Sequence, residues 1–231
     1  MKKSLAAASG PIMLVVCLIF LAQTSQAQIV NEQTRKKFSF GIGMFTDIWN
    51  NIPDGFKTRD INQGFHAFAM YNVPFGKTNL GFSVGLGFRA QNLYVKDAIF
   101  NSTNDSTYLV AINDSISVKR SKLTLPYLEL PVEFYFKSKV KVVAAVGFKI
   151  AYGLPAHTKY VGEDYNTGNG DEYRVKFREI HNVQRFSFGP TLRIGYQWIH
   201  VYGYYSLSKI FTKDKGPDMY PISVGLVLLP Y

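Results

Sequence analysis

The feature that most constrains this chain is the strict alternation of large apolar residues with small or polar ones. Between residues 80 and 90 every second position is apolar: Leu80, Phe82, Val84, Leu86, Phe88 and Ala90. The positions between them hold Gly81, Ser83, Gly85, Gly87 and Arg89. A period of two residues is typical of a β-strand with two unlike faces. The chain therefore builds a sheet with one broad apolar face.

The same alternation returns over residues 140–152 and 186–198, where the opposite face carries small residues and occasional charges, Lys141, Lys149 and Arg193. A small closed barrel has room inside only for modest side chains, whereas its exterior can carry many large ones. The pattern therefore predicts an apolar face that points outward into lipid. The alternative is a secreted soluble barrel that binds a ligand, with the apolar face inside.

The N-terminus has the features of a secretory signal peptide. Lys2 and Lys3 form a basic start, residues 12–22 are apolar but too few to span a bilayer, and Ser25-Gln26-Ala27 has the small-x-small pattern of a cleavage site. We expect residues 1–27 to be removed and residues 28–231 to form one barrel domain. The competing interpretation is a lipoprotein signal at Cys17, but Val16 is too bulky to precede a lipidated cysteine.

Composition narrows the function classes. Cys17 is the only cysteine, so the mature chain can form neither a disulfide nor a thiolate metal site. Removing Lys2 and Lys3 from the 26 basic residues leaves 24 against 16 acidic ones, a net charge of +8. No Lys/Arg run is interleaved with aromatics, so we interpret this charge as facing anionic lipid head groups or sugars, not nucleic acid. No apolar stretch after Ala27 is long enough for a transmembrane helix.

Turn-forming residues divide the mature chain into eight predicted strands. These lie near residues 38–44, 65–73, 80–90, 127–136, 140–152, 186–198, 200–210 and 220–229. Long loops, two of them near Asn92–Ser121 and Leu154–Asn182, alternate with short turns near residues 74–78, 137–139 and 198–200. Small outer-membrane barrels show this asymmetry. The predicted fold is all-β, an eight-stranded antiparallel up-and-down transmembrane β-barrel.

Two further features fit closure in a membrane. An even number of strands lets the first and last strands pair, which leaves no open edge in lipid. Aromatic residues also lie toward predicted strand ends, where aromatic girdles would sit: Tyr71, Tyr152, Tyr196, Trp198, Tyr205 and Tyr220. The alternative explanation is that β-sheets are rich in tyrosine in general.

The segment Tyr127-Leu128-Glu129-Leu130-Pro131-Val132-Glu133, followed by a short turn and the glycine-bearing strand 142–152, resembles a motif of the PorT-like outer-membrane β-barrel family of the Bacteroidota. The resemblance implies an eight-stranded barrel, and PorT itself belongs to the type IX secretion machinery. Such barrels commonly end in an aromatic residue in phase with the lipid face. Tyr231 follows Pro230 and is out of that phase.

Several charged residues share the phase opposite the lipid-facing residues. They are Glu129, Glu133, Lys149, Arg193 and Arg89. The interior of an eight-stranded barrel is filled, and buried carboxylates are stable there when paired with cations. We therefore predict a structural ion network in the lumen and no pair of catalytic carboxylates.

One contact in this network is specific enough to test. If Lys137 pairs with Lys141 around a three-residue turn, Glu129 lies directly opposite Lys149 in the next strand. Directly opposed side chains lie about 4.5–5.5 Å apart at Cβ, so a salt bridge follows. Pro131 has no N–H to donate, and we expect a bulge or distortion of the strand at this residue.

Other motifs do not predict a site. The histidines, His66, His157, His181 and His200, lack metal-ligand spacing, so we predict neither a metal nor another cofactor. The order of residues between Asp164 and Glu172 does not fit an EF-hand calcium loop. Asp105-Ser106-Thr107 and Asp114-Ser115-Ile116 resemble the O-glycosylation tripeptide of the Bacteroidota. No phosphate loop, nucleophile elbow or catalytic triad spacing is visible.

These patterns predict a non-enzymatic integral outer-membrane protein with a filled lumen, which acts as a structural or interaction protein through long extracellular loops. Its expected partners are outer-membrane lipid and envelope or secretion-machinery proteins. One alternative is a PorT-like accessory component of type IX secretion assembly, which rests on the resemblance. Another is an enzyme at the barrel rim, which needs His157 or His181 to meet a nucleophile.

Overall fold

Residues 38–231 form one compact unit. The computed structural model describes residues 37–113, 115–165, 170, 172–178 and 180–229. The predicted signal peptide and Tyr231 lie outside the described residues. Within the described ranges, no helix is long and apolar enough to cross a membrane.

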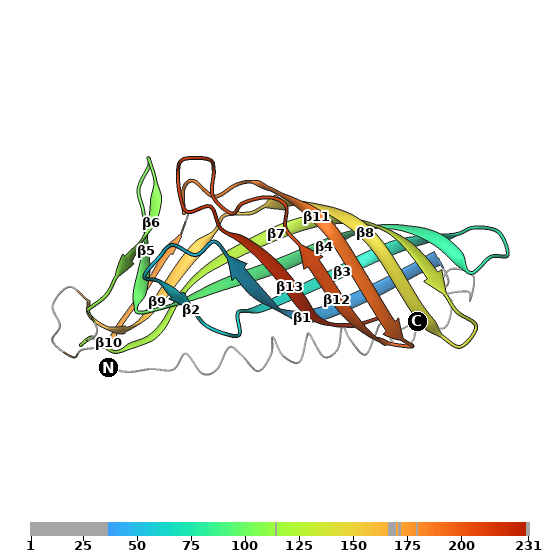
Figure 1. Ribbon diagram of the computed structural model, residues 1–231, viewed down its shortest axis with the longest axis horizontal. Helices are drawn as coiled ribbons and strands as arrows, with labels where there is room; N and C mark the ends of the chain where they lie inside the picture. Colours follow the sequence, from blue (N-terminus) through green and yellow to red (C-terminus); the bar gives the residue numbers. More distant parts are fainter. Residues whose placement is uncertain (1–36, 114, 166–169, 171, 179, 230–231) are drawn as a thin grey trace, which may run out of the picture. The chain divides into compact units, whose positions relative to one another are not determined.

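Eight antiparallel strands close into a ring (Figure 1). They are β1 (Phe38–Asn50), β3 (Gln63–Pro74), β4 (Leu80–Lys96), β7 (Val118–Lys137), β8 (Val142–Gly153), β11 (Phe186–Tyr196), β12 (Ile199–Tyr205) and β13 (Tyr220–Leu228). Each strand pairs with the next along the wall, and β13 pairs back onto β1. The predicted fold class, an eight-stranded antiparallel barrel, is confirmed.

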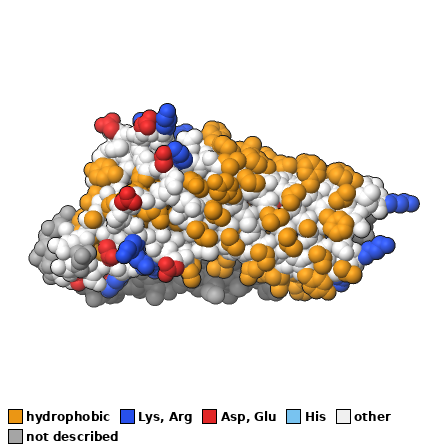
Figure 2. All heavy atoms as spheres, viewed as in Figure 1, with side chains coloured by type: hydrophobic (Ala, Val, Ile, Leu, Met, Phe, Trp, Pro, Cys, Tyr) orange, Lys and Arg blue, Asp and Glu red, His pale blue; other side chains and the backbone are white. Residues whose placement is uncertain are grey.

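The alternating pattern places the large apolar residues outside and the small and polar residues inside. Met44, Leu86 and Trp198 have exposed fractions of 67%, 70% and 63%. Figure 2 shows hydrophobic side chains over the middle of the visible wall and charged side chains toward the two ends. Facing inward, Ser83 and Ser223 are buried. Lipid stabilises such an exterior, whereas water does not.

The aromatic residues singled out in the sequence lie near both ends of the wall. Tyr71, Tyr196 and Trp198 are exposed near the short turns. At the opposite end Tyr152 is exposed, and Tyr205 packs edge-on against Tyr220 with ring centroids 5.9 Å apart. This is the placement of aromatic girdles at two membrane interfaces.

The two long connections predicted near residues 92–121 and 154–182 lie at one end of the barrel, but they contain strands that were not predicted. Within residues 92–121, β4 and β7 stay paired beyond the end of the barrel wall. Between them, β5 (Ala98–Ser102) and β6 (Thr107–Ala111) form a hairpin. Within residues 154–182, β9 (His157–Glu163) pairs with β7, and β10 (Glu172–Arg178) pairs with β9. β2 (Lys57–Thr58) adds to the edge of β4.

An apolar cluster at this end explains why these segments are ordered. Leu93 on β4 and Leu123 on β7 are fully buried, and they pack with residues of the β5–β6 hairpin such as Phe100. Trp49 on β1 and Met219 before β13 belong to the same cluster. We call this end, comprising the connections β1–β3, β4–β7, β8–β11 and β12–β13, the loop end.

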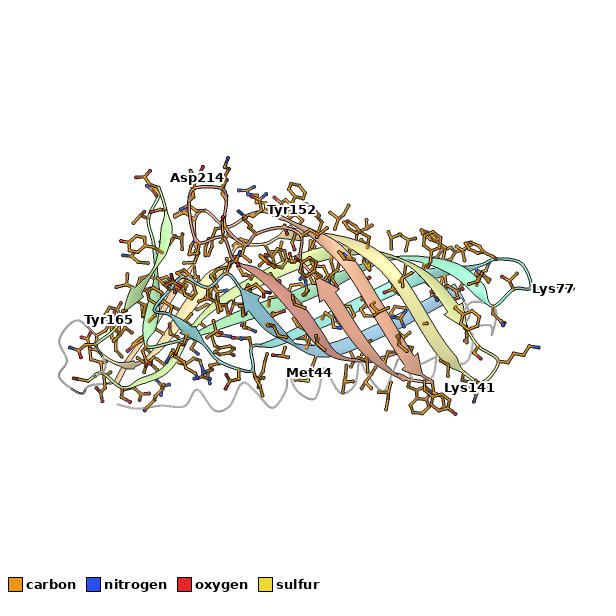
Figure 3. All side chains as sticks on the ribbon, in the orientation of Figure 1. Met44, Lys77, Lys141, Tyr152, Tyr165 and Asp214 are labelled. Atoms are coloured by element: carbon orange, nitrogen blue, oxygen red, sulfur yellow. The ribbon has the colours of Figure 1, made fainter. Side chains whose placement is uncertain are left out.

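The opposite end of the wall has three short connections, at residues 75–79, 138–141 and 197–198. We call it the turn end. Lys77 and Lys141 lie there, whereas Tyr165 and Asp214 lie at the loop end (Figure 3). Lys141 and Gln197 have positive φ angles of 65° and 52°. The predicted junction between the sixth and seventh strands, residues 198–200, starts one residue and ends two residues after the observed turn.

Pro131 does not insert a bulge. The pairing of β4 with β7 stops at Glu129 and resumes at Val132, with Gly87 and Val84 as their partners. The register is the same on both sides of this gap. The missing N–H thus interrupts the ladder locally, as expected, but no residue is inserted and the predicted bulge is wrong.

Candidate functional site in the barrel lumen

All five charged residues predicted to face inward are buried in the lumen: Arg89, Glu129, Glu133, Lys149 and Arg193. They come from β4, β7, β8 and β11. The structure arranges them as two clusters, one around each glutamate. The outward-facing residues of these four strands are apolar and face lipid. The charged side chains avoid lipid because they point into the lumen.

The first cluster is centred on Glu129. Its Oε2 atom accepts a hydrogen bond from Lys149 Nζ at 3.0 Å and lies 3.2 Å from Arg89 Nε. Lys149 Nζ also donates to the hydroxyl group of Tyr202. The Arg89 guanidinium lies 4.7 Å from the ring centroid of Tyr127, and the cation is thereby stabilised by an aromatic face as well as by the carboxylate.

Glu129 and Lys149 meet diagonally across β7 and β8. The observed register pairs Glu129 with Ala151 and Pro131 with Lys149, so the predicted register, with Glu129 directly opposite Lys149, is wrong by two residues. The cause is the turn, because Lys137 pairs with Val143 instead of Lys141. A slip of two residues keeps both side chains on the inner face, and the long lysine side chain spans the diagonal.

The second cluster is centred on Glu133. Arg193 Nη2 donates to Glu133 Oε2 at 2.7 Å, and Arg193 Nη1 lies 3.1 Å from His200 Nδ1. Because a guanidinium can only donate, His200 Nδ1 is the acceptor. The other ring nitrogen, Nε2, then carries the proton and donates to the carbonyl oxygen of Gln197 at 3.1 Å. This fixes His200 as the neutral tautomer and ties the cluster to the turn between β11 and β12.

Sequence reasoning missed Asp47 in the lumen. Its Oδ1 atom accepts hydrogen bonds from Ser223 Oγ at 2.6 Å and from Gln91 Nε2 at 3.0 Å. Asp47 lies on the inner face of β1, as Gly43 does. It was not predicted to face inward because the predicted strand ended at Met44, three residues before it. The buried Asp, Glu, Lys and Arg side chains of the described residues are thus three acidic and three basic ones.

One cavity in the described part of the lumen is about the size of a water molecule. A cavity of about 10 Å³ is lined by His66, Met70, Glu133, Thr191, Arg193 and Tyr202. That volume holds roughly one water molecule. His66 Nε2 and Thr191 Oγ1 are buried there without a hydrogen-bond partner, so they are the groups that such a water would satisfy. This cavity is too small for a substrate or a hydrated ion.

The histidines do not form a site with a nucleophile or a metal in the part of the chain that is described. His66 packs among aromatic rings, 4.7 Å from the centroid of Tyr202, and His157 lies on β9 opposite Arg178. No group of His, Cys, Asp and Glu among the described residues could hold a metal ion. Asp114, Asn166, Asn169 and Asp171 lie outside the described residues.

A closed antiparallel ring with an apolar exterior and a filled polar interior defines a transmembrane β-barrel. Residues 23–212 match the outer membrane protein beta-barrel domain family, so the chain belongs to that family and is an outer-membrane protein. No curated protein matches the chain.

Solved structures of several barrels are similar to this chain. Ail, the attachment invasion locus protein of Yersinia pestis, is 12% identical with a TM-score of 0.41, over 84% of this chain and 97% of Ail. Ail in complex with the heparin analogue sucrose octasulfate is 13% identical with a TM-score of 0.39, at the same coverage. A mutant porin of Rh. blastica is 10% identical with a TM-score of 0.19, over 83% of this chain and 98% of the porin.

Proposed function

We propose that this protein is a non-enzymatic outer-membrane anchor that presents its loop end as an interaction surface. The observation that carries the proposal is the apolar cluster beneath that end. Because Phe100 of the β5–β6 hairpin packs with Trp49, Leu93 and Met219, this hairpin is held against the barrel strands. A fixed surface can bind a protein partner without first losing conformational entropy.

The lumen supports a structural role. Five of its six buried charges are paired in two clusters, and the sixth, Asp47, accepts hydrogen bonds from Ser223 and Gln91. Buried ion pairs of this kind favour one arrangement of strands, because any register that separates Glu133 from Arg193 leaves unpaired charges in the wall. The barrel itself is then a rigid support for the loop end.

We propose that the loop end faces the outside of the cell and the turn end faces the periplasm. Long extracellular and short periplasmic connections are the rule in bacterial outer-membrane barrels. We also propose that residues 1–27 are removed on export. The mature protein would then begin at Gln28, which intact-mass spectrometry of the purified protein measures directly.

A photo-crosslinking experiment tests the interaction surface. Tyr108 on β6 is 44% exposed at the loop end, and Phe75 in the β3–β4 turn is 45% exposed at the turn end. Each is replaced in turn by benzoylphenylalanine in the cells that make the protein. We expect discrete crosslinked adducts with envelope proteins from position 108. Adducts from position 75 alone would contradict the assignment of the binding surface to the loop end.

The finer alternative is a PorT-like accessory role in type IX secretion assembly. It is supported by the resemblance of residues 127–133, which form the middle of β7. In that case deletion of the gene would abolish the appearance of type IX cargo at the cell surface. Normal cargo export in the deletion strain would contradict the PorT-like role. It would not affect the proposal of a general interaction role.

A further inference from the structure

Three lysines form a row across adjacent strands at the loop end. Lys122 on β7 is directly opposite Lys159 on β9, and Lys159 is directly opposite Lys176 on β10. Directly opposed side chains lie about 4.5–5.5 Å apart at Cβ, and like charges in that position destabilise a sheet. None of the three forms an ion pair within the described residues. An anion bound over the row would remove the repulsion.

The rows on either side add further positive charge to the same face. Arg120 and Arg174 flank Val161 in one row, and Arg178 lies opposite His157 in the other. Two acidic side chains, Glu172 and the directly opposed Glu163, lie in the next row of this face and offset part of this charge, and Glu172 pairs with Arg174 at 3.0 Å. Burial and the nearby charges of Lys176, Lys122 and Arg178 lower the pKa of His157. The field on this face is therefore positive and incompletely neutralised.

Lys122 is held in place by two neighbours on β4. Its Nζ atom donates to Asn92 Oδ1 at 2.8 Å and lies 5.5 Å from the ring centroid of Tyr94. A side chain that is already ordered loses less entropy when it binds an anion. The site is thus anchored on the barrel strand β7 and extends sideways over β9 and β10.

The position of the row identifies the source of the anion. On β7, Lys122 has the same phase as the lipid-facing Leu128 and Leu130, so the row is on the outer wall and faces sideways. Lys122 is roughly 20 Å along the strand from Leu128. Because the strand is tilted by about 35–45°, Lys122 lies roughly 15 Å above Leu128 along the membrane normal. This height is greater than the thickness of a layer of simple phospholipid head groups, which is roughly 5–8 Å. A phosphorylated saccharide head group of a glycolipid in the same leaflet reaches this level.

We propose that the outer face of β7, β9 and β10, centred on Lys122, Lys159 and Lys176, binds the phosphate groups of a glycolipid that lies beside the barrel in the membrane. This inference deepens the proposed function, since it rests on the loop end facing the glycolipid-bearing leaflet. Surrounding lipid would then fix the height and orientation of the interaction surface.

The test compares two triple variants of the full-length mature protein in detergent micelles. One is Lys122→Gln/Lys159→Gln/Lys176→Gln. The matched control, Lys77→Gln/Lys139→Gln/Lys141→Gln, removes the same charge at the turn end. The probe is lipid A with a phosphorylated inner-core oligosaccharide, and bound lipid is counted by native mass spectrometry. We expect at least a tenfold loss of affinity in the first variant, a change of less than twofold in the control, and weak binding of the dephosphorylated probe.

Equal binding by both variants, or equal binding of the dephosphorylated probe, would overturn the proposal. So would a sulfated polysaccharide that binds through the same lysines while the glycolipid does not, because the partner would then be a soluble polyanion. Lys159→Gln alone, at the centre of the row, gives the same comparison if the triple variant fails to fold. Binding in micelles does not depend on orientation in the cell, so a failed topology assay and a failed binding assay remain distinguishable.

Discussion

Glu129 and Lys149 form a hydrogen-bonded ion pair of 3.0 Å across two strands in which neither is the direct partner of the other. The carboxylate is shared, because Arg89 lies on the same Oε2 atom at 3.2 Å. One carboxylate is thus shared by two buried cations. Removing the charge of Glu129 therefore affects both cations at once.

Glu129→Gln is expected to destabilise the barrel by about 3–5 kcal/mol, because it leaves two buried cations without their carboxylate. The free energy of unfolding is measured by urea titration in micelles. Glu172→Gln removes an exposed carboxylate and is the control, with little change in the free energy of unfolding expected. A loss no larger than that of the control would show that Glu129 is not paired in the folded protein.

Adding Lys149→Met to Glu129→Gln is expected to restore only part of the lost stability. The second substitution removes one of the two unpaired cations, while Arg89 remains and keeps its stacking contact with Tyr127. A double-mutant cycle on these two residues measures the coupling. Strictly additive losses would mean that the two side chains do not interact.

Gly147→Ala is expected to destabilise the barrel by about 1–3 kcal/mol through overpacking. A Cβ atom at this position would lie 2.3 Å from the carbonyl oxygen of Val132 and 2.8 Å from Glu133 Cγ. Gly203→Ala is the matched control, since the nearest atom to its Cβ would be 3.9 Å away. Unfolding in urea should separate the two variants, and equal stabilities would argue against the packing described around Glu133.

Planar-bilayer recordings of the purified protein are expected to show no stable conductance steps. The ion pairs of Glu129 and Glu133 lie across the lumen, and the apolar cluster covers its loop end. Buffer with 1 M salt tests the prediction most stringently, because it maximises any current. Reproducible steps of uniform size would contradict the filled lumen.

A short epitope inserted after Asn104, at the tip of the β5–β6 hairpin, is expected to bind antibody on intact cells. The same epitope after Gly76, in the β3–β4 turn, should bind antibody only after the outer membrane has been permeabilised. Both sites lie between paired strands, so neither insertion should prevent folding. Labelling of the Gly76 epitope alone on intact cells would invert the proposed orientation.

The wall of the barrel could be predicted from sequence because its cause is local. Each residue of a segment such as Leu80–Ala90 faces either lipid or the lumen, and alternation along the chain records that choice directly. The same logic identified the inward side chains of Glu129 and Arg193. It failed at Asp47 only because the predicted strand was too short.

The loop end could not be predicted because its cause is non-local. Leu93 and Leu123 point into a cluster whose other members come from distant segments, including Trp49 and Met219. Turn residues such as those at 103–106 mark a hairpin only when the strands around them have something to pack against. The register of β7 and β8 was missed for a different reason. It depends on a positive φ at Lys141, a residue type that does not signal that conformation.

The pairing of β1 with β13 has a consequence for the order of assembly. The seam runs from Ile42 opposite Leu228 to Asn50 opposite Tyr220, so the wall is incomplete until nearly the entire chain has been exported. An open ring would expose two rows of unpaired backbone groups to lipid. Insertion one strand at a time, as synthesis proceeds, is therefore unfavourable. The chain must remain soluble in the periplasm until β13 arrives, and a product truncated before Tyr220 has no membrane state to occupy and becomes a substrate for proteolysis.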